Sequence, residues 1–256
     1  MIDFHNHIIP NLDDGPKSLE NSLAMIQKAY SDGFSTIVNT VHLDHPSVHV
    51  SKEQILKYHI LSKNLEKECR KINIPITIIP CAEVYFSEKT YERCFMKNVL
   101  INNKYILIEL NVGLLPVGLE RTLYKIQLKK ITPIIAHPER YIYVQKNYKI
   151  LESFLNKGII IQLNAKSFFS KNELERKTVR NIIESGLFHL VGSDAHNNES
   201  RNFHLKECYD FISKNYGKKY TLRIIENTKN LVEGGQIGSI RCKKKSYFDQ
   251  IKSFLR

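Results

Sequence analysis

Two histidines separated by one residue are the first side chains in this chain that could do chemistry. The sequence opens Asp3-Phe4-His5-Asn6-His7, after a short apolar start. Successive side chains of a strand point to opposite faces, so His5 and His7 would point the same way. Asp13 and Asp14 follow before a Gly-Pro turn. Imidazole nitrogens and carboxylate oxygens are typical ligands of divalent metals, although the histidine pair alone also fits the end of a surface strand.

Further histidine and acidic residues stand at or just after the ends of other apolar segments. In chain order they are His42, Glu83, Glu109, His137, Asp194 and His196. In α/β barrels the carboxyl ends of the strands gather the functional side chains at one rim. A single histidine after a strand is usually structural, but so many strands each delivering His, Asp or Glu favour a multinuclear metal site.

Short β-branched segments alternate with amphipathic segments along the chain. The predicted strands are Ile2–His5, Ser35–Val41, Ile76–Cys81, Tyr105–Leu110, Thr132–Ala136, Gly158–Leu163 and Leu187–Gly192. The predicted helices cover 18–32, a segment that begins with a capping-box pattern at 51–54 and ends before 74–75, and regions near 118–130, 146–157, 172–185 and 203–215. This alternation, with strands apolar on both faces, predicts an α/β fold in which parallel strands close into a barrel.

The overall composition is that of a globular protein without a membrane span. The 256 residues contain no long linker, 42% are hydrophobic and 25% are charged, and no secretion signal is recognisable, so we expect one main domain in the cytoplasm. The net charge of +12 indicates either an anionic partner or a lysine-rich solvated surface. Because no nucleic-acid-binding motif accompanies the charge, we expect no nucleic-acid partner.

Five short motifs together resemble the polymerase-and-histidinol-phosphatase (PHP) superfamily and, within it, the bacterial capsule and exopolysaccharide tyrosine-protein phosphatases. The motifs are D-F-H-N-H at 3–7, D-D-G-P-K at 13–17, A-E at 82–83, A-H-P-E-R at 136–140 and G-S-D-A-H-N at 192–197. The resemblance extends to about Leu231 and implies a distorted (β/α)7 barrel over 1–235. The chain departs from the family pattern at Leu43-Asp44-His45, where another histidine often follows His42 directly, at Thr40-Val41-His42, which lacks the usual Pro, and at 226–228, where Asn-Pro is common. The first departure lies in a substrate-facing loop, 43–50.

The resemblance also implies a site with three divalent metal ions, usually assigned as manganese, with iron, zinc or magnesium as alternatives. Its ligands would be His5, His7 and Asp194 for one ion, Glu83 as a bridge to a second ion completed by Glu109 and His137, and Asp14, His42 and His196 for the third. Arg140 and Arg201 would act in catalysis by binding phosphate oxygens, since a guanidinium can donate two parallel hydrogen bonds. The alternative role for Arg140 is a salt bridge to Glu139 or to a neighbouring carboxylate.

The activity that this resemblance implies is metal-dependent hydrolysis of phosphotyrosine on a bacterial tyrosine kinase that controls capsule or exopolysaccharide synthesis. One alternative is a histidinol-phosphate or other small-molecule phosphomonoesterase of the same superfamily. Another is a non-catalytic regulatory module of a polysaccharide complex. The complete set of ligand residues argues against the last of these.

The five cysteines do not fit thiol-based phosphatase chemistry. That mechanism needs an arginine six positions after the nucleophilic cysteine, and here the corresponding residues are Pro75, Ser87, Leu100, Lys214 and Phe248. The number of cysteines is odd and no C-x-x-C pair occurs, which favours reduced thiols acting as small hydrophobic side chains.

The last residues, 236–256, are predicted to form a basic amphipathic tail. If residues from Ser246 onward are helical, Phe248, Ile251 and Leu255 share one face beside a cluster of lysines. Such a tail would either pack against the barrel or make peripheral contact with an anionic membrane or a membrane-bound kinase.

Overall fold

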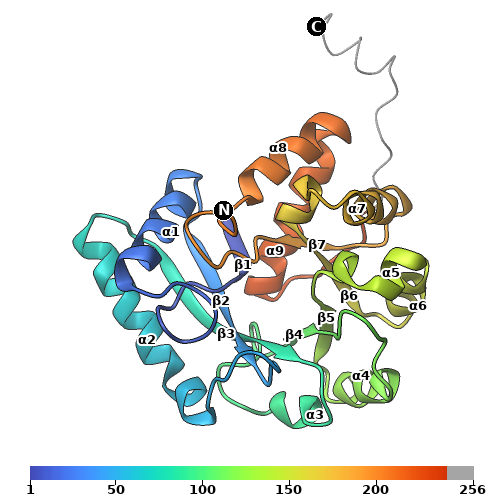
Figure 1. The fold of residues 1–256 in the computed structure, drawn as a ribbon, viewed down its shortest axis with the longest axis horizontal. Helices are drawn as coiled ribbons and strands as arrows, with labels where there is room; N and C mark the ends of the chain where they lie inside the picture. Colours follow the sequence, from blue (N-terminus) through green and yellow to red (C-terminus); the bar gives the residue numbers. More distant parts are fainter. Residues whose placement is uncertain (241–256) are drawn as a thin grey trace, which may run out of the picture.

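Seven parallel strands form the centre of the computed structural model, which describes residues 1–240 (Figure 1). The strands are β1 Ile2–Asn6, β2 Thr36–Leu43, β3 Thr77–Tyr85, β4 Tyr105–Glu109, β5 Thr132–Ile135, β6 Ile160–Asn164 and β7 Leu190–Gly192. Each strand pairs with the next one along the chain, so the order in the sheet is the order in the sequence. The carboxyl ends of all seven strands therefore lie at the same end of the sheet.

The sheet closes where β1 meets the chain that follows β7. Asn6 and Ala195 form a parallel bridge, the backbone N–H of His7 donates to the carbonyl of Ala195 at 2.8 Å, and the N–H of Asp194 donates to the carbonyl of His5 at 2.7 Å. The closure is distorted, because these bonds are made by the residues just after the short strand β7. The predicted (β/α)7 barrel is confirmed.

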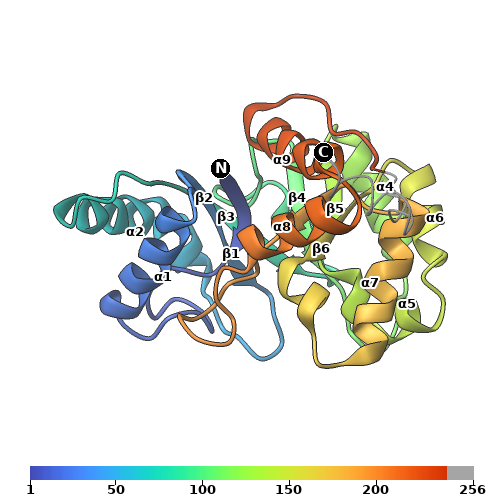
Figure 2. The ribbon, with the colours of Figure 1, turned by 90° about the horizontal axis from the view of Figure 1, so that it is seen from above.

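Helices surround the strands (Figure 2). They are α1 Leu19–Ser31, α2 Lys52–Lys71, α3 Thr90–Arg93, α4 Leu119–Leu128, α5 Ile142–Lys146, α6 Ile150–Asn156, α7 Glu173–Ser185, α8 Leu205–Asn215 and α9 Lys218–Glu233, with 3₁₀ turns η1 Pro138–Arg140 and η2 Ala165–Phe169. The helix predicted near 146–157 is confirmed as α6, but it begins later, at Ile150, because Asn147 adopts a non-helical conformation between α5 and α6. The sequence prediction also missed α9.

Local sequence sets where the first helices begin. The Ser18 hydroxyl accepts a hydrogen bond from the N–H of Asn21 at the start of α1. Ser51 and Gln54 form the predicted capping box, in which each side chain satisfies the other residue's backbone N–H before α2. These caps satisfy N–H groups that the first turn of a helix leaves without an intrahelical acceptor.

Two hydrophobic clusters lie on the two faces of the sheet. The outer cluster, which includes Ile37 and Ile108, packs between strands and helices. The inner cluster includes Val38, Cys81 and Leu107. Because side chains alternate, His42, Glu83 and Glu109 lie on the inner face, four or two residues beyond these apolar positions. β2 and β3 continue further than predicted, so His42 and Glu83 belong to these strands instead of following them.

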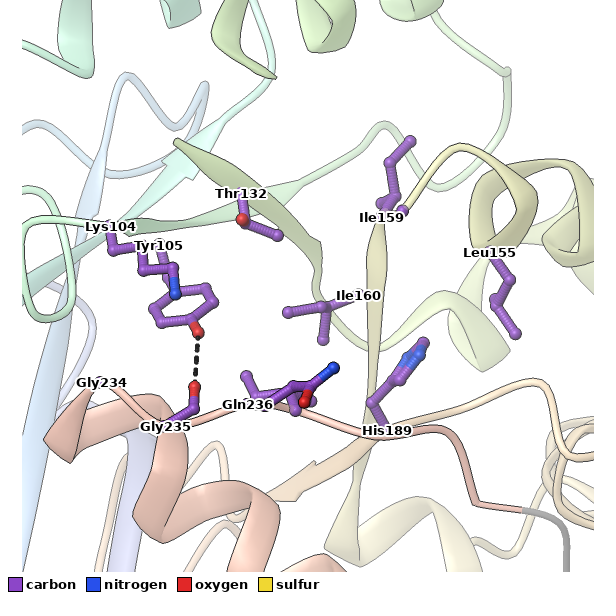
Figure 3. Close-up of a pocket in the computed structure, with 12 residues that line it drawn as sticks. Lys104, Tyr105, Thr132, Leu155, Ile159, Ile160, His189, Gly234, Gly235 and Gln236 are labelled. Carbon is purple, nitrogen blue, oxygen red and sulfur yellow. Dashed lines mark hydrogen bonds between the residues drawn. The ribbon is translucent and has the colours of Figure 1, made fainter. Parts of the chain in front are cut away.

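A cavity of about 420 Å³ lies at the opposite end of the barrel, beside the amino-terminal ends of β4 to β6 (Figure 3). Its wall includes Tyr105, Thr132, Ile160 and His189, and the Tyr105 hydroxyl donates to the carbonyl of Gly235 at 3.4 Å. No carboxylate is among the lining residues from the described part of the chain. The cavity is therefore separate from the acidic rim.

His189 at this cavity should make the fold sensitive to acid. Burial lowers the pKa of His189 to about 4, and its Nδ1 accepts a hydrogen bond from the N–H of Ile161 at 3.1 Å. Since the unfolded chain binds this proton near pH 6.5 and the folded chain only near 4, stability is present above 6.5 and is lost as pH falls through that window. We expect a loss on the order of 1–3 kcal/mol. Urea unfolding at pH 7 and 4.5 should show a smaller pH difference for His189→Gln, which keeps an acceptor for Ile161; an equal difference would contradict this role.

Three sequence-based expectations concern thiols, membrane spans and the tail. Cys69, Cys81, Cys94 and Cys208 are buried and unpaired. Within residues 1–240, none of the helices has both the length and the apolar character required to span a bilayer. The part of the predicted tail from 241 onward, including the lysine cluster and the apolar face, lies outside the described residues.

Candidate metal centre

The structure brings the nine predicted ligand residues together at the carboxyl ends of the strands. Ligand atoms lie within 4.8 Å of one another in three groups, which are His7, Asp14, His42 and His196; His5, His7, Glu83 and Asp194; and His42, Glu83 and Glu109. His137, the one predicted ligand outside these groups, places its Nε2 3.0 Å from Oε1 of Glu83. The groups share members, so the three positions form one continuous cluster.

Glu83 lies at the centre of this cluster. Its Oε2 is 3.1 Å from Nε2 of His5, 3.3 Å from Nε2 of His7 and 3.4 Å from Nδ1 of His42. Its side chain has no exposed surface. A carboxylate with each oxygen facing a different set of imidazoles is suited to bridge two cations.

Backbone geometry at two positions turns side chains into the centre. His137 and Asp194 have positive φ values of 30° and 52°, which are uncommon for residues other than glycine and cost about 1–3 kcal/mol each. Pro138 then begins η1 immediately after His137. Close packing also matters, since a Cβ on Gly192 would lie 2.7 Å from the Cβ of His5. A side chain at Gly192 would displace His5.

Hydrogen bonds orient three of the imidazoles. Nδ1–H of His5 donates to Oε1 of Gln162 at 3.0 Å, and Nδ1–H of His7 donates to Oδ2 of Asp13 at 2.7 Å. Nδ1–H of His196 donates to the carbonyl of Asp194 at 2.9 Å. With Nδ1 protonated, Nε2 of each ring keeps the lone pair that a metal would need.

The pKa shifts in the cluster reflect burial and close contact between ionisable groups. Burial disfavours the charged form of Glu83, but His5 and His137 outweigh it and hold the pKa of that carboxyl well below its usual range. Burial, together with the neighbouring Glu83 and Asp194 charges, raises the pKa of Glu109 to about 9. Burial and the neighbouring His7 lower the pKa of His42 to about 3. An added cation would relieve the repulsion on Glu109 and would bind His42 in its neutral form.

Unpaired buried atoms test whether these residues fit a metal. Among the described residues, five polar atoms that face the cluster are buried and have no hydrogen-bond partner, namely His5 Nε2, His7 Nε2, His42 Nδ1, Glu83 Oε2 and Glu109 Oε2. Leaving a buried polar atom unpaired costs about 1–3 kcal/mol, so their convergence needs an explanation. Divalent cations bound by nitrogen and carboxylate oxygen would satisfy all five. The donor set therefore fits a metal centre.

Two arginines contact carboxylates of the centre. Nη1–H of Arg140 donates to Oδ2 of Asp194 at 2.7 Å, so the salt bridge considered for Arg140 exists, with Asp194 as its partner. Arg201 donates from Nη1 to Oδ2 of Asp14 at 3.2 Å and from Nη2 to Nε2 of His196 at 2.8 Å. The Arg201 guanidinium thus contacts the groups expected to hold the third metal, and a cation bound there would compete with it.

Sequence reasoning missed the residues that support the ligands. Gln162 orients His5 and also accepts the backbone N–H of His137, while Nδ2 of Asn164 donates to Oδ2 of Asp194 at 2.8 Å. Both are fully or almost fully buried in β6. A glutamine and an asparagine in an otherwise apolar strand, two residues apart and therefore on one face, were the signal that could have identified them.

Comparisons with known proteins agree with this fold and donor set. A family model described as capsular polysaccharide synthesis, CpsB/CapC, matches residues 1–233. The chain is 32% identical over 241 residues to a protein named tyrosine-protein phosphatase CpsB from Streptococcus pneumoniae, covering 91% of this chain and 98% of that protein. It is also 32% identical over 242 residues to tyrosine-protein phosphatase YwqE from Bacillus subtilis, covering 93% of each.

A solved structure is similar over nearly the full length. It comes from a study of YwqE from Bacillus subtilis and CpsB from Streptococcus pneumoniae, described as unique metal-dependent tyrosine phosphatases. The TM-score is 0.86 at 30% identity, covering 96% of this chain and 100% of the other. An amidohydrolase from Mycoplasma synoviae, at 12% identity and a TM-score of 0.53, shares the fold alone.

Proposed function

Because this chain belongs to the CpsB/CapC family of capsular polysaccharide synthesis proteins, we propose that it is a metal-dependent protein-tyrosine phosphatase. The observation that carries the proposal is the convergence of unpaired, buried histidine and glutamate atoms around Glu83, with two arginines beside them. This arrangement offers cation ligands and phosphate donors in one place. The reaction is hydrolysis of a phosphate monoester, with water as the second substrate.

Three divalent metal ions are proposed for the centre, with manganese as the first choice and iron, zinc or magnesium as alternatives. His5, His7 and Asp194 would hold one ion, Glu83 would bridge to a second held also by Glu109 and His137, and Asp14, His42 and His196 would hold the third. When bound, such ions lower the pKa of water and neutralise charge on phosphoryl oxygens. The contribution of the protein is to hold the ligands rigidly, which the hydrogen bonds from Gln162 and Asp13 support.

The two arginines would bind and orient the phosphate. Arg140 uses Nη1 for Asp194, and its other guanidinium nitrogens make no hydrogen bond within residues 1–240. These remaining donors could contact phosphoryl oxygens as negative charge builds up in the transition state. Arg201, whose Nη2 lies 3.6 Å from Oδ2 of Asp194, would do the same once a cation replaces it at Asp14 and His196.

The cysteines do not supply a nucleophile in this proposal. Burial raises the pKa of Cys81 to about 12 and those of Cys69 and Cys94 to about 11, so these thiols stay protonated. Burial also raises the pKa of Cys208 well above its usual value. A thiol is a poor nucleophile in its protonated form.

The proposed substrate is an autophosphorylated bacterial tyrosine kinase of polysaccharide assembly, met in the cytoplasm. We propose residues 1–235 as the catalytic barrel and 236–256 as a basic tail, whose part from 241 onward touches an anionic membrane peripherally. Residues 236–240 pack on the barrel, where Ile240 forms a bridge with Phe188 and Gly238 is hydrogen-bonded to Asn227. Each basic residue near an anionic membrane surface contributes about 1 kcal/mol to the free energy of membrane binding. Sedimentation with phosphatidylserine vesicles at low salt tests the tail, and equal binding by the full chain and by a chain lacking 241–256 would remove its targeting role.

The experiment that tests the function compares two substrates on metal-reconstituted protein. A phosphotyrosine peptide should be hydrolysed with Mn²⁺ present, activity should disappear with a chelator, and a variant with all five cysteines replaced should keep its activity when folded. Faster hydrolysis of histidinol phosphate would instead favour the small-molecule phosphatase. Absence of turnover on both substrates by metal-loaded protein would favour a regulatory module.

A further inference from the structure

The loop after β2 is held in place by an ion pair between a partly buried aspartate and a buried arginine. Asp44 has a positive φ of 60° and accepts two hydrogen bonds from Arg93, from Nε at 2.6 Å and from Nη2 at 2.8 Å. Arg93 lies in α3, 49 residues further along the chain, and only 7% of its side chain is exposed. Paired hydrogen bonds of this kind fix direction as well as distance. The next residue, His45, is therefore held in a defined position at the rim.

His45 lies between the candidate metal centre and a neighbouring cavity. On the side of the centre, its Nε2 is 3.7 Å from Oε2 of Glu109 and its ring lies 4.6 Å from the ring of His42. The ring of Tyr85 meets it edge-on at 5.3 Å, and the Tyr85 hydroxyl accepts a hydrogen bond from Nδ2 of Asn111. His45 also borders a cavity of about 440 Å³ whose wall includes Val48 and Val50.

These contacts place an aromatic ring between the ligand cluster and the cavity. A phosphate ester bound beside Glu109 carries its organic group outward from the centre. His45 is the aromatic side chain that contacts Glu109 on one side and the cavity on the other. Two contacts hold the His45 ring in place. Tyr85 packs against it edge-on, and Nδ1 of His45 accepts a hydrogen bond from the N–H of Ser47 at 3.2 Å. An aromatic ring held in this way can pack against another ring at little cost in side-chain freedom.

We propose that His45 is a specificity-determining residue, against which the aryl group of the phosphate ester packs, and that Arg93 positions it through Asp44. This inference rests on the proposed phosphatase function and names the part of the substrate that the rim selects. Aromatic pairs are worth a factor of about 3 to 10 in affinity beyond the area that they bury. Phosphate compounds with an aryl group should therefore bind more tightly than those with an alkyl group by about that factor.

The test measures binding of two phosphate analogues that cannot be hydrolysed, phenylphosphonate and methylphosphonate, to metal-loaded protein by calorimetry. In the unmodified protein we expect tighter binding of phenylphosphonate. His45→Ala should reduce the ratio of the two affinities about 3- to 10-fold, and His45→Phe should restore it. Arg93→Gln, which releases Asp44, should reduce the ratio in the same direction. His59→Ala is the matched control and should leave the ratio unchanged. His59 lies on α2, where its Nδ1–H donates a hydrogen bond to the carbonyl of Leu56 in the same helix.

Two results would overturn the inference. The first is an unchanged affinity ratio in both His45→Ala and Arg93→Gln. The second is loss of metal from folded His45→Ala, measured by elemental analysis, which would make His45 a ligand instead. Hydrolysis of the phosphotyrosine peptide by the unmodified protein is measured in parallel. If the peptide is not hydrolysed but His45→Ala still lowers the affinity ratio, the proposed reaction is wrong and the proposed aryl-binding role of His45 is supported.

Discussion

Glu83→Gln is expected to lower the metal content of the protein and to reduce kcat/KM for a phosphotyrosine peptide by more than about 10³-fold. The carboxylate faces His5, His7 and His42 through Oε2, and replacing it with a neutral amide removes the charge at the point that all three share. Metal ions typically contribute several kcal/mol to stabilising the transition state, and each 1.4 kcal/mol is about tenfold in rate. Elemental analysis beside steady-state kinetics measures both effects.

Glu66→Gln provides the matched control for this substitution. Glu66 is also a buried glutamate, 2% exposed, but it lies on α2, where Oε1 accepts the N–H of Ile78 and Oε2 pairs with Lys63. Its replacement should cost some stability and leave metal content unchanged. Full metal occupancy in folded Glu83→Gln would contradict the central role of Glu83.

Arg140→Ala is expected to lower kcat/KM by about 10²- to 10³-fold, the scale of one lost oxyanion donor, while the metals stay bound. Asp194 loses one partner in this variant but keeps the hydrogen bond from Nδ2 of Asn164. The kcat/KM of Arg140→Lys should lie between those of the unmodified protein and Arg140→Ala, because lysine restores the positive charge without the paired donors of a guanidinium. Kinetics and metal analysis on the same samples separate phosphate binding from metal binding.

The control here is Arg223→Ala, which removes an exposed arginine paired with Glu226 on α9. It should change neither rate nor metal content. An empty centre in Arg140→Ala would show that Arg140 holds Asp194 for the metal, and unchanged activity would show that it does not contact the phosphate.

The sequence predicts the strands well where apolar residues alternate or run together, and less well where buried polar residues continue a strand. His42 and Leu43 extend β2 past its predicted end at Val41, because the His42 side chain is buried and faces the rim of the barrel and not solvent. A pattern read as apolar inside and polar outside ends such a strand too early. The short closure of β7 on β1 depends on backbone pairing, which no residue pattern reveals.

The candidate ligands could be predicted because each is a residue type that metals bind, placed at a strand end. Their supporting residues were missed, because Gln162 and Asn164 stand out in the sequence only as two polar residues in an apolar strand, and only the fold shows that they reach His5 and Asp194. The ion pair between Asp44 and Arg93 joins a loop to a four-residue helix far along the chain. Such pairs become visible only when tertiary structure places the two charges together.

The closure of β1 onto the chain after β7 also determines when the centre can form during protein synthesis. Asp3 and Ser193, which hydrogen-bond at this closure, are separated by 190 residues. At about 5–20 residues per second, a ribosome needs on the order of 10–40 s between the two. A nascent chain that ends before Asp194 carries His5 and Glu83 without the strand that completes their site. Ribosome-bound and prematurely terminated chains should therefore be inert toward phosphorylated protein, and activity should begin only when almost the whole barrel has emerged.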